Sequence, residues 1–257
     1  MQSDKTVLIT GASGNLGGKL RQHLEGRYPL RLLDIDPGDD PAIQRADFSL
    51  WDERWVSQFR GVQTVVHMAA DPTAQQTWAE VVLPNIDGLI NVFTAAARAG
   101  VKRLVYASSN HVMGGYKTLE QPERLTTDIP PRPGTHYVVG GEPRDSTPYG
   151  AAKLMGERLG KCYSDIYGMS VIAVRIGAIQ PGPNRPEDFP PDREAWFRLM
   201  WLSNRDYCQL MERCIEADPA LRFAVVNGMS ANSGMRWDID YTRELLGYEA
   251  QDDVNRS

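Results

Sequence analysis

The chain has 257 residues, of which 42% are hydrophobic and 24% are charged. These are the proportions of an ordinary globular protein, so the composition excludes a wholly disordered chain. A formal net charge of −5 without any basic block predicts no nucleic-acid partner. The apolar runs span only a few residues, far fewer than the ~18–20 of a membrane span, so we expect no membrane insertion.

The cysteines and histidines suggest neither disulfides nor a metal site. Cys162, Cys208 and Cys214 are odd in number and lack CxxC spacing, which favours free thiols in a reducing compartment. The four histidines are scattered and form no metal-binding motif, so no metal is expected. The chain enters a strand-like run at Thr6–Thr10 without a charged and then apolar export segment, and we therefore expect a cytoplasmic protein.

Short apolar runs alternate with stretches of helical spacing through the first two thirds of the chain. The predicted strands are Thr6–Thr10, Leu30–Asp34, Thr64–Ala69, Arg103–Ala107 and Ser170–Arg175. The predicted helices are Asn15–Glu25, Leu50–Phe59, Asn85–Ala99 and Tyr149–Tyr167. This alternation predicts an α/β fold, a Rossmann-like doubly wound parallel sheet with helices on both faces.

Two segments and the C-terminal third depart from this rhythm. Residues 114–148 are rich in Pro and Gly and predict a lid-like insertion, and Gln180–Asp192 contains five prolines. Helices are predicted at Asn204–Ala217 and Asp238–Leu246, with a strand at Phe223–Val226. We predict a sheet domain over residues 1–175 and a small cap over residues 176–257.

The segment Thr10–Gly17, which reads TGASGNLG, lies between the first strand and the first helix. Gly11 permits a tight turn, Gly14 lets the backbone approach a pyrophosphate, and Gly17 lets the helix pack closely on the strand. The N-terminus of the helix adds free N–H groups and a partial positive charge for phosphates. The pattern predicts a dinucleotide site that also includes Ser13, Asn15 and Leu16.

An acidic residue, Asp34, ends the second predicted strand about 20 residues after the glycine turn. A carboxylate at this place accepts hydrogen bonds from ribose hydroxyls and repels a 2′-phosphate. Residues 35–40 contain no Arg or Lys that would bind such a phosphate. The sequence therefore predicts NAD as the cofactor rather than NADP.

Tyr149 and Lys153 form a YxxxK pair, which places both side chains on one face of a helix. An ammonium beside a phenol favours the phenolate and lowers the phenol pKa from about 10, which makes Tyr149 a candidate general base for an alcohol. Ser108 and Ser109 follow a predicted strand at the edge where parallel sheets bind ligands. We expect Ser109, the later of the two, to hydrogen-bond the reacting oxygen.

Together, TGxxGxxG, Asp34, Ser109 and YxxxK resemble the extended short-chain dehydrogenase/reductase superfamily over nearly the whole chain. The resemblance implies that Tyr149 is the acid–base, that Lys153 orients the nicotinamide ribose, and that Ser109 holds the substrate oxygen. It also implies cofactor contacts at Asp47, Phe48, His67, Met68, Ala69, Ala70, Asn85 and Ile176, where Asn85 is either structural or on the cofactor side.

Within that superfamily, Ser108–His111, Met200–Asp206 and Ser230–Asn232 are similar to a subgroup of NAD-dependent sugar C1 dehydrogenases. The subgroup contains uronate dehydrogenases and glucose-6-phosphate dehydrogenases of this fold, with sulfoquinovose dehydrogenases nearby. The resemblance implies oxidation of the C1 hydroxyl of an aldohexose with an anionic C6 group to a lactone.

The substrate contacts implied by this resemblance are Asp71, Ser109, Asn110, His111, Tyr149, Ala178, Arg193 and Arg198. Arg132 and Arg144 in the insertion are weaker candidates for binding the anion. Ala178 stands where uronate dehydrogenases have a serine, which counts against plain uronate oxidation.

Two other functions use the same pattern. A nucleotide-sugar epimerase or dehydratase would have the same Ser, Tyr and Lys set and keep its NAD permanently, although this chain is short for one. A non-catalytic NAD-sensing protein tends to lose this set, which is complete here. By analogy with the superfamily, we expect a homodimer or higher homo-oligomer that pairs the helices near residues 87–99 and 149–167.

Overall fold

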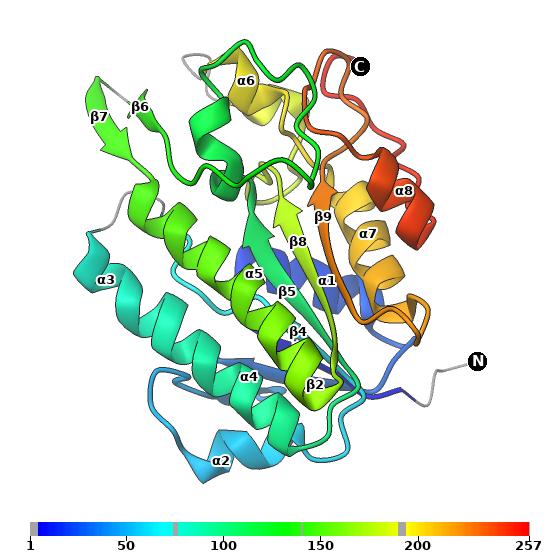
Figure 1. Cartoon of the computed structure of the whole chain (residues 1–257). Helices are drawn as coiled ribbons and strands as arrows, with labels where there is room; N and C mark the ends of the chain where they lie inside the picture. The colour runs from blue at the N-terminus through cyan, green and yellow to red at the C-terminus, as the bar shows by residue number, and fades with distance from the viewer. Residues whose placement is uncertain (1–4, 74–76, 140, 190–193, 257) are drawn as a thin grey trace.

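A seven-stranded parallel sheet forms the centre of the protein (Figure 1). The structure is a computed structural model that describes residues 5–73, 77–139, 141–189 and 194–256. The sheet has the strand order β3–β2–β1–β4–β5–β8–β9. The strands are β1 Val7–Thr10, β2 Leu30–Asp34, β3 Ile43–Arg45, β4 Thr64–His67, β5 Arg103–Ser109, β8 Ser170–Ile176 and β9 Phe223–Gly228.

Helices cover both faces of the sheet, as the continuous apolar strands predict. The longer ones are α1 Asn15–Leu24, α4 Gly88–Arg98, α5 Thr147–Tyr167 and α7 Asn204–Glu216. In Figure 1, α4 and α5 lie in front of the sheet, and α1 and α7 lie behind it. Successive strand residues serve opposite faces: Val7 and Ile9 pack in the cluster with α1 and α7, and Leu8 packs in the cluster with α4. The predicted Rossmann-like fold is confirmed.

The helix before β5 begins earlier than the sequence predicts. It starts as α3 Trp78–Val82, continues through a π-helical turn, η2 Leu83–Asp87, and runs into α4. Thr77 and Glu80 form a capping box that sets this earlier start. Pro84 has no N–H for the regular helical hydrogen bond, and the π turn accommodates it.

The insertion contains regular structure where we predicted none. A 3₁₀ segment, η3 Asn110–Tyr116, follows β5 directly, and a two-stranded antiparallel hairpin joins β6 His136–Val139 to β7 Glu142–Asp145. The hairpin projects from the upper left of the molecule in Figure 1. Its strands are short and lie outside the main core, so they lack the sustained apolar pattern by which a strand is recognised.

Short helices complete the described part of the fold. They are α2 Glu53–Val56 with η1 Ser57–Phe59, η4 Pro186–Asp188, α6 Ala195–Arg198 and α8 Asp240–Leu246. Within the described residues, no helix is both long and apolar enough to cross a membrane.

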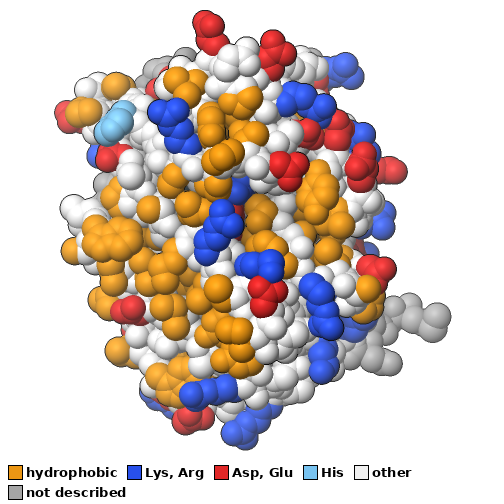
Figure 2. Space-filling model, viewed as in Figure 1, with side chains coloured by type: hydrophobic (Ala, Val, Ile, Leu, Met, Phe, Trp, Pro, Cys, Tyr) orange, Lys and Arg blue, Asp and Glu red, His pale blue; other side chains and the backbone are white. Residues whose placement is uncertain are grey.

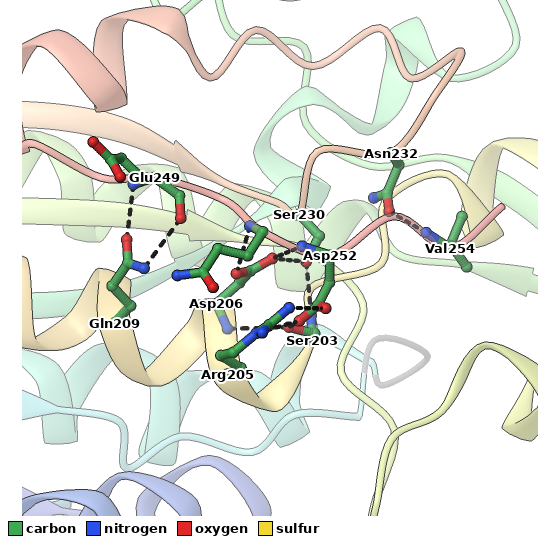
Figure 3. Close-up of polar contacts among 10 residues, drawn as sticks. Ser203, Arg205, Asp206, Gln209, Ser230, Asn232, Glu249, Asp252 and Val254 are labelled. Carbon is green, nitrogen blue, oxygen red and sulfur yellow. Dashed lines mark hydrogen bonds and ion pairs between the residues drawn. The ribbon is translucent and has the colours of Figure 1, made fainter. Parts of the chain in front are cut away.

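A polar clasp ties the C-terminal segment to α7 and to the loop after β9 (Figure 3). Asp206 is fully buried and accepts hydrogen bonds from the Ser230 hydroxyl at 2.6 Å and from the backbone N–H groups of Gln251 at 2.9 Å and Asp252 at 3.0 Å.

Because β9 extends the central sheet, the C-terminal third shares the main core and also forms a small apolar cluster with Trp201. The division into a sheet domain and a cap at residue 175 stays a prediction.

Candidate active site

A cavity of about 930 Å³ opens at the carboxyl ends of the central strands. The strand order reverses between β1 and β4, and doubly wound sheets bind ligands at such a switch point. Many of the residues predicted from the sequence line this cavity. They are Gly11, Ser13, Gly14, Asn15, Leu16, Gly17, Asp34, Asp47, Phe48, Met68, Ala69, Ala70, Asp71, Ser109, Asn110, His111, Tyr149, Ile176 and Ala178.

The glycine turn is shaped by contacts that leave no room for side chains. Gly11 has a φ of +72°, and a Cβ there would lie 2.8 Å from the Ala69 nitrogen. A Cβ on Gly17 would lie 1.9 Å from the Gly11 carbonyl oxygen. Gly14 starts α1 without a side-chain cap, and the first turn carries no acidic residue. The helix N-terminus therefore offers its N–H groups to an anion in the cavity.

Thr10 fixes the loop that follows β4 against the glycine turn. Its hydroxyl oxygen accepts the N–H groups of Met68 and Ala69, both at 3.2 Å, and lies 2.8 Å from His67 Nδ1. Burial, together with the charge of Lys153, lowers the pKa of His67 to about 3, so the ring is neutral and Nδ1 accepts the Thr10 proton. His67 is 2% exposed and lies beneath the cavity, so its predicted place at the cofactor surface is wrong.

Two carboxylates lie at the β2–β3 end of the cavity. Asp34 accepts the backbone N–H groups of Ser13 and Asp36, each at 3.0 Å, which holds its carboxylate beside the glycine turn. Asp47 accepts the N–H and the hydroxyl of Ser49 at 3.0 and 2.6 Å. A ribose hydroxyl at this end would find acceptors, and a 2′-phosphate would meet negative charge.

Ser109, Tyr149 and Lys153 come together at the carboxyl end of β5. Tyr149 is nine-tenths buried, and its hydroxyl hydrogen-bonds Ser109. Lys153 Nζ donates to the Ala107 carbonyl at 2.9 Å and lies 5.6 Å from the centre of the Tyr149 ring, behind the cavity wall. A Cβ on Gly156 would lie 2.4 Å from the Tyr106 ring, so this glycine allows α5 to approach β5 closely enough for these contacts.

Ser108 points away from the cavity. Its hydroxyl donates to Glu157 at 2.7 Å, and Glu157 forms an ion pair with Arg175 in which both side chains are at most 3% exposed. Alternate residues of a strand face opposite sides, so Ser109 faces Tyr149. The structure thus brings the serine that we favoured to the tyrosine.

The pKa of Tyr149 differs from the value that its spacing from Lys153 suggests. Burial raises the pKa of Tyr149 to about 12, and the charge of Asp71 adds to this, whereas the hydrogen bond from Ser109 opposes it. Burial also lowers the pKa of Lys153 to about 8. The prediction that the lysine brings the tyrosine pKa below its usual value is therefore wrong for the protein alone, because removal from water disfavours the phenolate.

Asn110 and His111 line the cavity directly after β5, two strands away from β1 and its glycine turn. Asn110 donates to the Ile176 carbonyl at 3.0 Å and accepts from Lys117 Nζ at 2.6 Å, so both ends of its amide already bind protein atoms. The His111 ring lies perpendicular to the Tyr149 ring at 5.6 Å. Burial and the charge of Lys117 hold the pKa of His111 well below its usual value, and within the described residues its Nδ1 has no hydrogen-bond partner.

Asn85 positions a residue of the cavity instead of lining it. Its side chain accepts the Asp71 N–H at 2.7 Å and donates to the Asp71 carbonyl at 3.1 Å. Both ends of the amide are thereby used, and the side chain is 3% exposed. Of the two roles that the resemblance implies for Asn85, the structure shows the structural one, and its cofactor contact is corrected.

Three of the arginines proposed for the substrate anion, Arg132, Arg144 and Arg198, are described by the structure and do not line the cavity. Arg198 is exposed, and its guanidinium donates to the Val254 carbonyl at 3.2 Å. Arg132 is exposed beside the Tyr116 ring, and Arg144 lies on β7 of the hairpin. Arg193 lies outside the described residues. The structure therefore does not bring Arg198 to the site as we predicted.

Lys117 is a residue that the sequence analysis missed. In the described parts of the chain, the charged groups that line the cavity are the carboxylates of Asp34, Asp47 and Asp71. Lys117 lies one hydrogen bond behind Asn110 and is 5% exposed. Its only sequence signal is a single lysine directly after the apolar and glycine-rich run Val112–Tyr116, and a lone lysine usually belongs to the surface.

The arrangement fits NAD and offers no metal site. The cavity volume lies within the usual range of ligand pockets, the bare N-terminus of α1 suits a pyrophosphate, and Asp34 suits a ribose. Among the described residues, no group of three or more His, Cys, Asp or Glu could hold a metal ion. Ser109 and Tyr149 then face the space between the dinucleotide site and Asn110, where a substrate hydroxyl would lie.

Comparisons with known proteins agree with this geometry. The model of the NAD dependent epimerase/dehydratase family matches residues 7–198. The NAD-dependent glucose-6-phosphate dehydrogenase of Haloferax volcanii is 38% identical over 97% of this chain and 94% of its own. The L-arabinose 1-dehydrogenase (NAD(P)(+)) of the same organism is 32% identical over 96% of each chain. A mutant uronate dehydrogenase from Agrobacterium tumefaciens, solved with NAD, has a TM-score of 0.79 and 31% identity over 98% of this chain and 86% of that one.

Proposed function

Since the chain belongs to the NAD dependent epimerase/dehydratase family, we propose that it is an NAD-dependent dehydrogenase that acts on a sugar. The substrate in this proposal is an aldohexose with an anionic group at C6, a phosphate, sulfonate or carboxylate, and the product is the lactone. The observation that carries the proposal is the contact of Ser109 with Tyr149, with Lys153 behind them, facing a cavity that begins at the glycine turn. Similarity along nearly the whole chain to an enzyme named for glucose 6-phosphate supports the choice of sugar.

In the proposed reaction, each residue of the set has a separate task. The Ser109 hydroxyl hydrogen-bonds the C1 oxygen of the sugar, and Tyr149 Oη receives the proton of that C1 hydroxyl. Lys153 keeps a positive charge behind the phenol and, in this proposal, holds the ribose of the cofactor. Bound NAD supplies the acceptor for the C1 hydride and a positive charge near the phenol.

The protonation of Tyr149 gives the reaction its pH dependence. With a pKa of about 12 in the protein alone, the phenol is protonated at neutral pH, and nearby positive charge is required to bring its pKa down. Because the base is the deprotonated form, activity at fixed saturating NAD rises with pH on the acid side of the pKa that Tyr149 has in the complex.

The experiment that tests the function measures NADH formation at 340 nm with glucuronate, glucose 6-phosphate, sulfoquinovose and glucose in parallel. We expect one anionic sugar to be oxidised faster than glucose. Purified protein with tightly held NAD and no net NADH formation on any sugar would contradict the proposal and support an epimerase instead.

Replacement of the base gives a second readout. Tyr149→Phe keeps the ring but removes the hydroxyl, so we expect kcat to fall by about 10²- to 10⁴-fold, the usual contribution of a positioned acid–base group. The NAD dissociation constant, measured by calorimetry, stays near the wild-type value. Tyr241→Phe, on exposed α8, is the matched control and keeps full activity. Near-wild-type kcat in Tyr149→Phe would remove the tyrosine from the mechanism.

We also propose a homodimer formed through the face of α4 and α5. Figure 2 shows hydrophobic side chains gathered on this face, and Trp78, Leu83, Ile166 and Tyr167 of α3, η2 and α5 are each more than half exposed. An apolar face of this kind is typical of a subunit contact.

The three cysteines are unpaired, which fits the reducing cytoplasm that we propose as the location.

A further inference from the structure

A buried lysine, Lys117, lies directly behind the part of the cavity wall that Asn110 forms after β5. Lys117 follows η3 and is 5% exposed. Its Nζ donates to the Asn110 side chain at 2.6 Å and lies 4.7 Å from the centre of the Trp196 ring. Because Asn110 lines the cavity, the Lys117 ammonium lies one hydrogen bond behind the cavity wall.

The charged groups around Lys117 leave its ammonium without a close counter-ion. In the described parts of the chain, no carboxylate lies within ion-pair distance of Nζ. The titratable groups that face it are Glu194, whose charge raises the pKa of Lys117, and His111, whose pKa the lysine lowers. Burial is the larger effect and lowers the pKa of Lys117 to about 7.

A buried charge without a partner is unfavourable, and the surroundings of Lys117 hold it by one neutral oxygen and one aromatic face. Among the described residues, the charged side chains that line the cavity are the carboxylates of Asp34, Asp47 and Asp71, which repel an anionic ligand. An anion bound beside Asn110 would therefore lie close to the positive charge of Lys117, a charge that the described residues of the cavity wall lack. The anion would also give Lys117 a counter-ion.

We propose that the ammonium of Lys117 binds the anionic C6 group of the sugar, with the anion accepting a hydrogen bond beside or in place of the Asn110 oxygen. The inference rests on the proposed function, since it names the group that selects an anionic over a neutral sugar. The C1 end of the same sugar would lie at Ser109 and Tyr149, which are on the cavity wall next to Asn110 and His111.

The test compares Lys117→Met with the wild-type protein on glucose 6-phosphate and on glucose, two sugars that differ by the phosphate. We expect the KM for glucose 6-phosphate to rise about 10- to 100-fold, as for a lost hydrogen bond to a charged group, with kcat changed little. The KM for glucose stays unchanged. Lys102→Met is the matched control, because Lys102 is exposed directly before β5, at the other end of that strand from the cavity, and it leaves both KM values unchanged.

The pH profile separates binding of the anion from a purely structural role. Between pH 7 and 9 the phosphate carries both charges, while the free protein loses the charge of Lys117 above about pH 7. The ratio of kcat/KM for glucose 6-phosphate to that for glucose therefore falls across this range in the wild type. The titration of Tyr149 affects both sugars and cancels in the ratio. In Lys117→Met the ratio is low and independent of pH.

Calorimetry with glucose 6-phosphate keeps the inference testable without turnover. Binding by the wild type that is lost in Lys117→Met supports the inference even if no sugar is oxidised, in which case only the proposed function fails. Retention of the wild-type ratio and binding in Lys117→Met overturns the inference. So does loss of the preference in Arg193→Met with Lys117 intact, because the anion would then bind the arginine.

Discussion

The charges around the cavity are arranged with carboxylates at its walls and ammonium groups behind them. Asp34, Asp47 and Asp71 line the cavity, whereas Lys117 and Lys153 are each at most 5% exposed. Burial lowers the pKa of the two lysines to about 7 and about 8, so their charges respond to whatever binds in front of them. In our proposal, Asp34 accepts hydrogen bonds from ribose hydroxyls, and the buried ammonium of Lys117 binds the anionic group of the sugar.

We propose that Asp34 sets the preference for NAD over NADP. Asp34→Ala removes the acceptor for the ribose hydroxyls and the charge that repels a 2′-phosphate. A hydrogen bond to a charged group is worth about 1.5–3 kcal/mol, so we expect the kcat/KM ratio for NAD over NADP to fall about 10- to 150-fold. Steady-state kinetics with both cofactors and the preferred sugar measure the ratio.

Asp39→Ala is the control for this change, since Asp39 is an exposed carboxylate on the same loop and lies outside the cavity lining. Its NAD to NADP ratio stays at the wild-type value. If folded Asp34→Ala kept the wild-type kcat/KM ratio for NAD over NADP, another group would have to recognise the ribose.

The sequence predicted the reacting residues better than their neighbours. Ser109, Tyr149 and Lys153 meet as expected, because helix spacing and the position at a strand end determine where those side chains lie. The partners of Asn85 and Asn110 could not be predicted, because an amide serves a ligand or the backbone equally well and only the folded chain decides. The same limit applies to pKa values, which depend on burial.

The elements that form the site differ in whether residues adjacent in the sequence are enough to predict them. The glycine turn and α1 were predicted from a few adjacent residues, because Gly14 and Gly17 relieve contacts with Gly11 in the same turn. The proline-rich segment before α6 is organised by Asn184, which has a φ of +54° and bonds the Gln180 N–H, the Trp201 indole and the Leu202 carbonyl. These partners are up to 18 residues away, so no local pattern indicates them.

Two neighbouring glycines of α1 test the close packing at the turn. Gly17→Ala places a methyl group 1.9 Å from the Gly11 carbonyl, so the helix must move away from the turn. Overpacking of this kind costs about 1–3 kcal/mol, and we expect the melting temperature to fall by roughly 2–10 °C and the NAD KM to rise at least tenfold. Differential scanning fluorimetry and kinetics measure the two effects.

Gly18→Ala provides the contrast one residue later. A Cβ there lies 4.0 Å from its nearest neighbour, and alanine favours a helix by about 1 kcal/mol over glycine. We therefore expect a small rise in melting temperature and an unchanged NAD KM. If both variants behaved alike, the steric account of the glycine turn would be wrong.

On the scale of the whole molecule, the end of the chain supports the cavity wall from behind. Asn232 donates to the Leu199 and Trp201 carbonyls, and Trp201 pairs with Ala178, which lines the cavity. The strings Met200–Asp206 and Ser230–Asn232 resemble the sugar dehydrogenases, and the structure gives several of their residues a structural task. Similarity in these strings is therefore not by itself evidence for a shared substrate.

Asp206 is the centre of that clasp, and its removal tests how far the support extends. Asp206→Ala leaves the Ser230 hydroxyl and two backbone N–H groups buried without their acceptor. Each such group costs about 1–3 kcal/mol, so we expect the free energy of unfolding to fall by about 3 kcal/mol or more and the melting temperature by at least about 6 °C. The KM values rise as well, because residues 201–203 lose their anchor.

Gln209→Ala, which removes only the solvent-side bonds to Glu249, changes the stability by less than about 1 kcal/mol. Equal urea midpoints for Asp206→Ala and the wild type would show that the C-terminal segment does not stabilise the fold, and faster amide exchange at residues 249–254 in this variant would locate the loss in the clasp.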